Sequence, residues 1–116
     1  LIIENKTIVI KMIDAEDMDS LKDFGNSLLL KLKNGIGVLG AVADKPMLVV
    51  VVTDTLIEAG IKAGDLAKQI GSIMGGGGGG RPNLATAGGK DQKSLETAME
   101  KAKDIILKNI EEKNAV

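Results

Sequence analysis

The sequence contains no histidine and no cysteine, and Phe24 is its single aromatic residue. The absence of His and Cys excludes imidazole acid–base chemistry, thiol nucleophiles, disulfides and ordinary zinc sites within this chain. The near absence of aromatics argues against a nucleic-acid binder that stacks bases on aromatic side chains. Any nucleic acid held here must be held by backbone amides, by Lys and Arg, and by flat apolar or glycine surfaces.

Long apolar runs are missing as well, since the longest, residues 47–52, has the length of a strand rather than of a membrane span. No signal peptide is evident and the chain does not begin with Met, so we expect a piece of a longer cytoplasmic protein with no membrane partner. The net charge of −1 over 116 residues argues against a basic nucleic-acid binder of the usual kind. Charge is uneven, because residues 55–94 carry five Lys and Arg against three Asp and Glu.

The most unusual segment of the chain is a run of six glycines at residues 75–80, followed by Arg81 and Pro82. Such a run is costly to order because glycine loses more backbone freedom on folding than any other residue. A flexible linker is the alternative, but a linker would mix glycine with serine and other polar residues. Bare N–H groups of a glycine loop can face an anion or a nucleic-acid backbone. The run therefore predicts a binding loop over residues 75–89.

Two nucleotide-binding motifs can be set aside. The run contains G-x-G-x-x-G trivially, but it follows a predicted helix rather than a strand, as a dinucleotide fingerprint requires. A phosphate-binding G-x-x-x-x-G-K-[ST] loop fails because Arg81 and Pro82 stand where Lys and Ser or Thr are needed.

The carboxylates offer no convincing catalytic pair or metal site. The cluster of Asp14, Glu16, Asp17 and Asp19 lacks the glycine and glutamate spacing of an EF-hand, and acids suit the positive end of a helix dipole. We expect a solvated helix start there. Asp54 ends a buried strand, where α/β sites often lie, but no His or second acid is near it in sequence. It is interpreted as the polar end of the strand or a helix cap.

The apolar patterns predict a single α/β domain over residues 1–116, with helices packed on a mixed sheet. Strands are expected at residues 7–13, 36–43 and 47–53, with a hairpin between the last two and a short extended segment at 85–89. Helices are expected from the acidic cluster to Asn34, from Gly64 into the glycine run, and from a cap at Asp91 onward.

The candidate nucleic-acid-binding residues combine the glycines with nearby cations and one amide. Arg81 could pair bidentately with a phosphate, or it could bond carbonyls of its own loop, and Asn83 has the same two interpretations. The full set is Gly75, Gly76, Gly77, Gly78, Gly79, Gly80, Arg81, Asn83, Lys68, Lys90 and Lys93.

These residues carry a specific resemblance. The stretch KAGD at residues 62–65, a helix, then GGGGGGRPNLATAGG and a closing amphipathic helix resemble the C-terminal domain of alanyl-tRNA synthetases, within the DHH-associated superfamily. The resemblance covers residues 7–110. The family pattern is a glycine-rich run, Arg-Pro-Asp, small residues and Ala-Gly-Gly. Asn83 replaces that Asp here, so a role for the carboxylate is not carried over.

The resemblance implies a DHH-associated-domain-like fold and a non-catalytic domain that binds the elbow of alanine-specific tRNA. In the family this domain helps the aminoacylation and editing domains of the same chain act on one tRNA, so that mischarged serine or glycine is cleared. It implies no cofactor in this domain, a parent ligase that uses ATP, magnesium and zinc, and a possible homodimer through the parent. The elbow ends in a flat tertiary base pair flanked by phosphates, which a glycine loop could approach closely.

Two other functions stay open. Related domains occur in DHH-family phosphoesterases and single-strand nucleases, where a histidine typically follows the glycine motif and a separate manganese-binding domain carries catalysis. This chain has no His, and Arg81 follows its glycines, which argues against that class. The third function is a protein-interaction or dimerisation module that uses the last helix.

Overall fold

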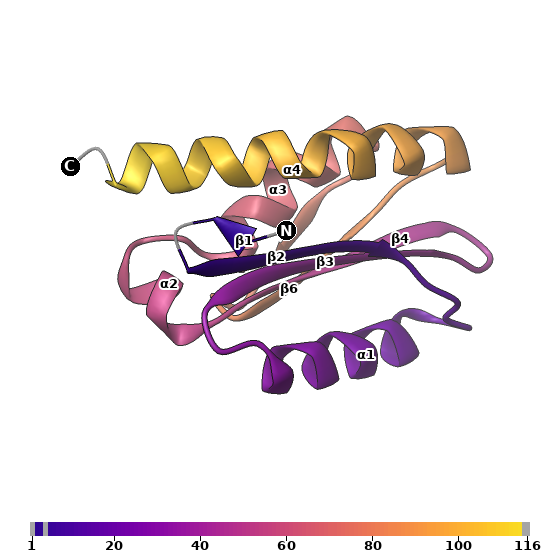
Figure 1. Ribbon diagram of the computed structural model, residues 1–116. Coiled ribbons are helices and arrows are strands. Elements are labelled where there is room, and N and C mark those ends of the chain that lie inside the picture. Colours follow the sequence, from indigo (N-terminus) through magenta and orange to yellow (C-terminus); the bar gives the residue numbers. More distant parts are fainter. Residues whose placement is uncertain (1, 4, 115–116) are drawn as a thin grey trace.

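The computed structural model describes residues 2–3 and 5–114. A mixed sheet lies between helices, with α3 and α4 on one face and α1 on the other (Figure 1). Three helices and four strands carry most of the chain: α1 Met18–Lys31, α3 Ala63–Ile73, α4 Gln92–Asn114, β2 Lys6–Met12, β3 Gly35–Val42, β4 Pro46–Val52 and β6 Leu84–Gly88. Shorter elements are β1 Ile2–Ile3, α2 Asp54–Glu58 and β5 Gly78–Gly80.

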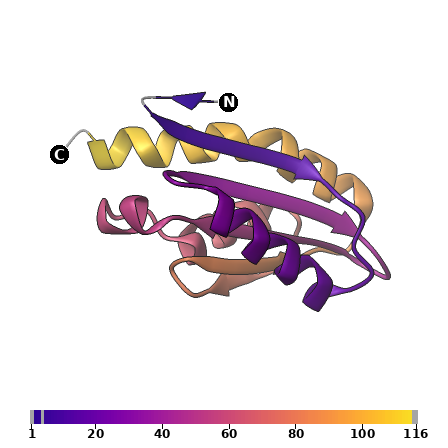
Figure 2. The same ribbon diagram turned by 60° about the horizontal axis from the view of Figure 1, so that its bottom comes forward.

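The six strands are ordered β1-β2-β3-β4-β6-β5. Only β2 and β3 are parallel, joined across the sheet face by α1, and every other neighbouring pair is antiparallel. The short turn between β3 and β4 makes the expected hairpin. Seen from the α1 side, the hairpin of β5 and β6 extends the sheet on its far edge from β2 (Figure 2).

Strand β4 separates two hydrophobic cores, because its successive side chains point to opposite faces. Leu48, Val50 and Val52 pack with α3 and α4. Met47, Val49 and Val51 pack with α1. All seven residues of β4 are buried, which confirms the buried strand expected before Asp54.

The predicted helix starts are confirmed by their caps. Asp17 Oδ1 accepts a hydrogen bond of 2.8 Å from the backbone N–H of Ser20. Asp91 Oδ1 accepts one of 2.7 Å from the N–H of Ser94 at the start of α4. Each carboxylate satisfies an N–H that would otherwise lack a partner in the first helical turn. Asp54 opens the first turn of α2, after Thr53 at the cap position.

The fold predicted from sequence, an α/β domain with a mixed sheet, is confirmed. Gly25 marks close packing of α1 on the sheet, since a Cβ there would lie 3.2 Å from the methyl carbons of Val49. The sequence patterns did not predict β1, and they treated the whole glycine run as a loop, whereas residues 78–80 form an edge strand. Within the described residues, no helix is both long and apolar enough to cross a membrane.

Candidate nucleic-acid interface

The glycine run begins as the C-terminal cap of α3. Gly75 adopts a φ of +74°, in the left-handed region. Its N–H donates to Ser72 O over 3.2 Å, and the N–H of Gly76 donates to Gly71 O over 3.3 Å. This pair of bonds is the Schellman arrangement that closes many helices with glycine. The first glycine of the run therefore has a structural explanation.

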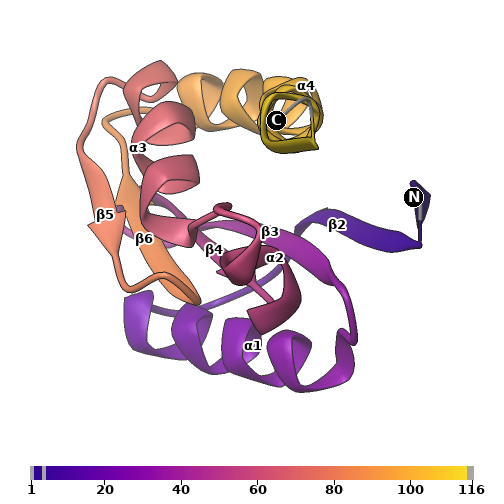
Figure 3. The ribbon, with the colours of Figure 1, turned by 90° about the vertical axis from the view of Figure 1, so that its left-hand side faces the viewer.

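Three further glycines are required by close backbone approaches. A Cβ on Gly76 would collide with the carbonyl oxygen of Gly88, and one on Gly78 would collide with the carbonyl oxygen of Ala67 in α3. Gly80 has a φ of +152°, and a Cβ there would lie 2.7 Å from the Cα of Ala85. These contacts let β5 pair with β6 at the outer edge of the sheet while its backbone lies directly against α3 (Figure 3).

Gly77 and Gly79 are different, because neither has a left-handed φ and nothing lies within 4 Å of a Cβ built on either. Gly79 pairs with Thr86 of β6. On β6, Ala85 and Ala87 belong to the core under α3 and α4, so Thr86 and Gly79 face the α1 side of the sheet. Helix α1 packs on β3 and β4, which leaves this outer part of the sheet open. We call Gly77, Gly79 and Thr86 the glycine strip.

Arg81 and Asn83 lie in the turn between β5 and β6. The backbone N–H of Arg81 donates to Leu84 O over 3.0 Å, and Val52 donates to Asn83 O over 3.0 Å. Both side chains lack a hydrogen-bond or ion-pair partner among residues 2–3 and 5–114, and the Arg81 side chain is exposed. No contact therefore supports the interpretation that the Arg81 side chain bonds carbonyls of its own loop. Its guanidinium is free for an external anion.

The cations divide between the two ends of the hairpin. Lys68, exposed on α3, lines a shallow groove of about 170 Å³ with Gly79, Gly80 and Pro82. Lys90 follows β6 at the opposite end, beside Gly76 and Gly77, and Lys93 is exposed at the start of α4. Gly76 and Arg81 are five steps apart along the chain, about 16 Å if it is extended. Arg81, Lys68 and Lys90 thus lie at the two ends of the strip, and the predicted site residues do not form a single cluster.

Sequence reasoning missed two neighbours of the strip. Lys62 and Asp65 share the groove of Lys68, and only the KAGD stretch next to the predicted helix start could have indicated them. A second, larger groove of about 620 Å³ lies between the start of α1, the β3–β4 turn and the glycine segments. Nothing in the sequence pattern indicated it, because its walls come from four separate stretches of the chain.

The acidic cluster before α1 holds no metal-like arrangement. Across the part of the chain that the structure describes, no three His, Cys, Asp or Glu side chains are placed to share a metal ion. The hydrogen bond from Ser20 holds the pKa of Asp17 below its usual value of 3.8. The cluster is a capped and solvated helix start, as the sequence predicted.

The chain is similar to known proteins in sequence and in fold. The sequence model of the DHHA1 domain matches residues 5–108. An alanine–tRNA ligase from Trichormus variabilis is 45% identical over 82% of this chain, and one from Alkaliphilus oremlandii is 36% identical over 89%. The chain spans only 11% and 12% of the length of these two relatives.

A solved structure shares the fold. The C-Ala domain of alanyl-tRNA synthetase from Aquifex aeolicus superposes with a TM-score of 0.75 at 23% identity, over 84% of this chain and 88% of that one. The resemblance to this synthetase domain that the glycine motif predicted is confirmed.

Proposed function

Because this chain belongs to the DHHA1 domain family, we propose that it is a tRNA-binding domain of an alanine–tRNA ligase. It docks on the elbow of alanine-specific tRNA and carries out no catalysis itself. The ligase names of its relatives support the parent activity. The absence of His and Cys from the sequence supports a binding role over a catalytic one.

The glycine strip is the observation that carries this proposal. The fold requires four of the six glycines, but it leaves space for a side chain at Gly77 and Gly79. At these two positions the fold would accept a side chain, yet the sequence has glycine. Backbone exposed in this way suits a ligand that approaches it closely. The flat base pair that ends a tRNA elbow is such a ligand, and it needs no aromatic platform.

The surrounding charges suit the same ligand. Arg81 and Lys68 border one end of the strip, Lys90 borders the other, and Lys93 is exposed at the start of α4. Phosphates on both sides of the base pair can be met by these exposed cations. The surface is only mildly positive, since residues 55–94 carry five Lys and Arg against three Asp and Glu, and the whole chain has a net charge of −1. We therefore expect weak binding by the isolated domain, strengthened when the parent chain holds it near the tRNA.

The proposed role is to keep one tRNA within reach of two active centres, one for aminoacylation and one for editing. The aminoacylation and editing domains of the parent chain are the expected partners, in a cytoplasmic enzyme that could form a homodimer. The zinc of such a ligase does not fit this domain, which offers no His or Cys, and its described part has no cluster of carboxylates for magnesium. We propose that the ATP of the ligase also binds elsewhere. All three would be bound by other parts of the parent.

Binding of the domain to three ligands at matched salt tests the proposal: folded tRNA, an isolated RNA hairpin and single-stranded DNA. We expect preference for folded tRNA, lost when mutations in the two elbow loops disrupt their tertiary pair. Gly77→Val should weaken tRNA binding without changing the melting temperature, because its side chain meets open space.

Other outcomes would redirect the assignment. Equal or better binding to single strands would favour a general nucleic-acid or nuclease-associated domain. Binding to none of the three ligands, together with dimerisation by light scattering, would replace the proposal with an interaction module.

A further inference from the structure

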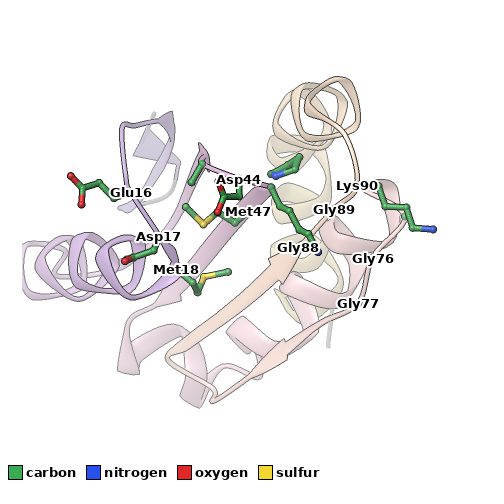
Figure 4. Close-up of a pocket in the computed structure, with 14 residues that line it drawn as sticks. Glu16, Asp17, Met18, Asp44, Met47, Gly76, Gly77, Gly88, Gly89 and Lys90 are labelled. Atoms are coloured by element: carbon green, nitrogen blue, oxygen red, sulfur yellow. The ribbon is translucent and has the colours of Figure 1, made fainter.

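The larger groove, of about 620 Å³, adjoins the glycine strip on the α1 side of the sheet. One wall is the start of α1 and another is the turn between β3 and β4. The opposite wall is glycine backbone at the open end of the β5–β6 hairpin, where residues 75–77 lead into β5 and residues 88–89 follow β6. Figure 4 shows Met18, Asp44 and Met47 between the α1 ribbon and the glycine segments, while Glu16 and Lys90 point away from the groove and the Asp17 carboxylate points back along α1.

Two methionines give the groove an apolar surface. Met47 is buried in the core under α1, and Met18 is half-buried at the first turn of that helix. Their thioethers lie between the α1 ribbon and the glycine segments (Figure 4). Thioether sulfur is polarisable and makes favourable contacts with aromatic rings. With glycine peptide planes opposite, the groove offers a flat ring two surfaces without any aromatic side chain.

A free carboxylate lies beside this apolar surface. Asp44, exposed in the β3–β4 turn, has a side chain with no hydrogen bond or ion pair within the described residues. Asp17 uses its carboxylate to cap α1 and points back along that helix (Figure 4). The Asp44 carboxylate is an acceptor, so it favours a ring whose edge carries N–H donors. The exposed Lys45 in the same turn supplies a charge for a phosphate.

We propose that this groove binds an unpaired nucleobase of the RNA and selects bases that carry an amino group. The inference rests on the proposed function, and it adds a second contact next to the glycine strip. Guanine presents two adjacent N–H donors to one carboxylate, and adenine and cytosine each present an exocyclic amino group. Uracil presents a single N–H between two carbonyls, which the carboxylate of Asp44 repels.

Methionine methyl NMR tests the groove directly, because the chain has five methionines. The probes are the four ribonucleoside 5′-monophosphates, with ribose 5-phosphate as the control for binding through phosphate alone. Guanosine monophosphate should shift the methyl signals of Met18 and Met47. Met12, which is 48% exposed and lies outside the groove, should not shift. Uridine monophosphate should bind about tenfold more weakly than guanosine monophosphate.

A matched pair of variants assigns the selectivity. Asp44→Asn should remove most of the preference for guanosine over uridine monophosphate. Asp23→Asn, on the exposed side of α1 and outside the groove, should keep it. Equal shifts from ribose 5-phosphate, shifts at Met12 as large as those at Met18, or an unchanged preference in Asp44→Asn would overturn the proposal.

Binding of folded tRNA to the same samples separates this inference from the proposed function. Intact tRNA binding with no nucleotide effect on Met18 or Met47 would reject the base site alone. Nucleotide binding in the groove without any tRNA binding would keep the base site and reject elbow docking.

Discussion

Gly78 faces the carbonyl oxygen of Ala67 so closely that no side chain can stand between strand β5 and helix α3. The next residue of the strand, Gly79, has nothing within 4 Å of the same position. Two adjacent glycines in one short strand therefore have different roles. The fold needs the first, and the second keeps the outer surface of the sheet bare.

This difference predicts opposite effects of the same substitution. Gly78→Ala should destabilise the domain by about 1–3 kcal/mol, because its Cβ overlaps helix backbone that cannot move without unpacking α3. Gly79→Ala should change the free energy of unfolding by less than about 0.5 kcal/mol. Urea unfolding followed by circular dichroism measures both. Equal losses would show that the whole run is structural and would remove the argument from the glycine strip.

The elements with one strong periodicity could be predicted from the sequence, and those made by tertiary contact could not. Strand β4 is an unbroken apolar run, and α4 carries an apolar stripe from Leu95 to Ile110, so both follow from pattern alone. Strand β5 is three glycines, a composition that favours no strand by itself. It forms because β6 and the backbone of α3 are already in place beside it.

The same limit applies to the candidate site. Its glycines and Arg81 stand out in sequence because a run of six glycines is unusual. The division of that run into required and free positions depends on distances to Ala67, Gly88 and Ala85, far away in the chain. The groove beside the strip combines Met18, Met47 and glycines that only the fold brings together. No local sequence motif therefore predicts this groove.

A buried hydroxyl joins the ends of β3 and β4. Thr53 Oγ1 accepts a hydrogen bond of 3.0 Å from the N–H of Gly35, and Thr53 is only 6% exposed. The hydroxyl of Thr55 donates to Asn34 Oδ1 over 2.7 Å and lies 3.2 Å from Thr53 Oγ1, so the network reaches the surface.

Thr53→Val should leave the Gly35 N–H without this partner. We expect a loss of about 1–3 kcal/mol in the free energy of unfolding, because the side-chain volume is kept while the acceptor is removed. Thr53→Ser retains the hydroxyl and serves as the control. A loss in Thr53→Ser as large as in Thr53→Val would assign the effect to the methyl group rather than to the hydrogen bond.

The cap of α1 should make a small part of the stability depend on pH. The pKa of Asp17 is lowered in the folded chain by its bond from Ser20, so folding favours the ionised carboxylate. Its contribution is fully present above the unfolded pKa, near 3.8, and is lost as pH falls through the lower folded value.

Comparison of wild type with Asp17→Ala measures this contribution. The variant should melt at a lower temperature than wild type at pH 6, and the difference should shrink as the pH is lowered below 4. Asp19→Ala is the control, since its side chain does not cap the helix. A difference between wild type and Asp17→Ala that stays constant from pH 6 to pH 3 would show that the carboxylate does not act through its charge.

Arg81 offers the sharpest test of how the domain meets RNA. Its guanidinium is exposed at the end of the glycine strip and has no partner among the described residues. If it contacts one phosphate, Arg81→Ala should weaken tRNA binding and reduce the slope of log Kd against log salt by about one. Because its side chain makes no contact that the fold needs, the melting temperature should stay unchanged.

The control for this measurement is Lys108→Ala, which also removes one positive charge from an exposed position, on the outer surface of α4. It should leave both the affinity and the slope as they are, because α4 covers the other face of the sheet from the strip. Equal slope changes in the two variants would mean that net charge, rather than a phosphate contact at Arg81, governs binding. An unchanged slope in Arg81→Ala would remove this residue from the interface and leave the cations at the opposite end of the strip to carry it.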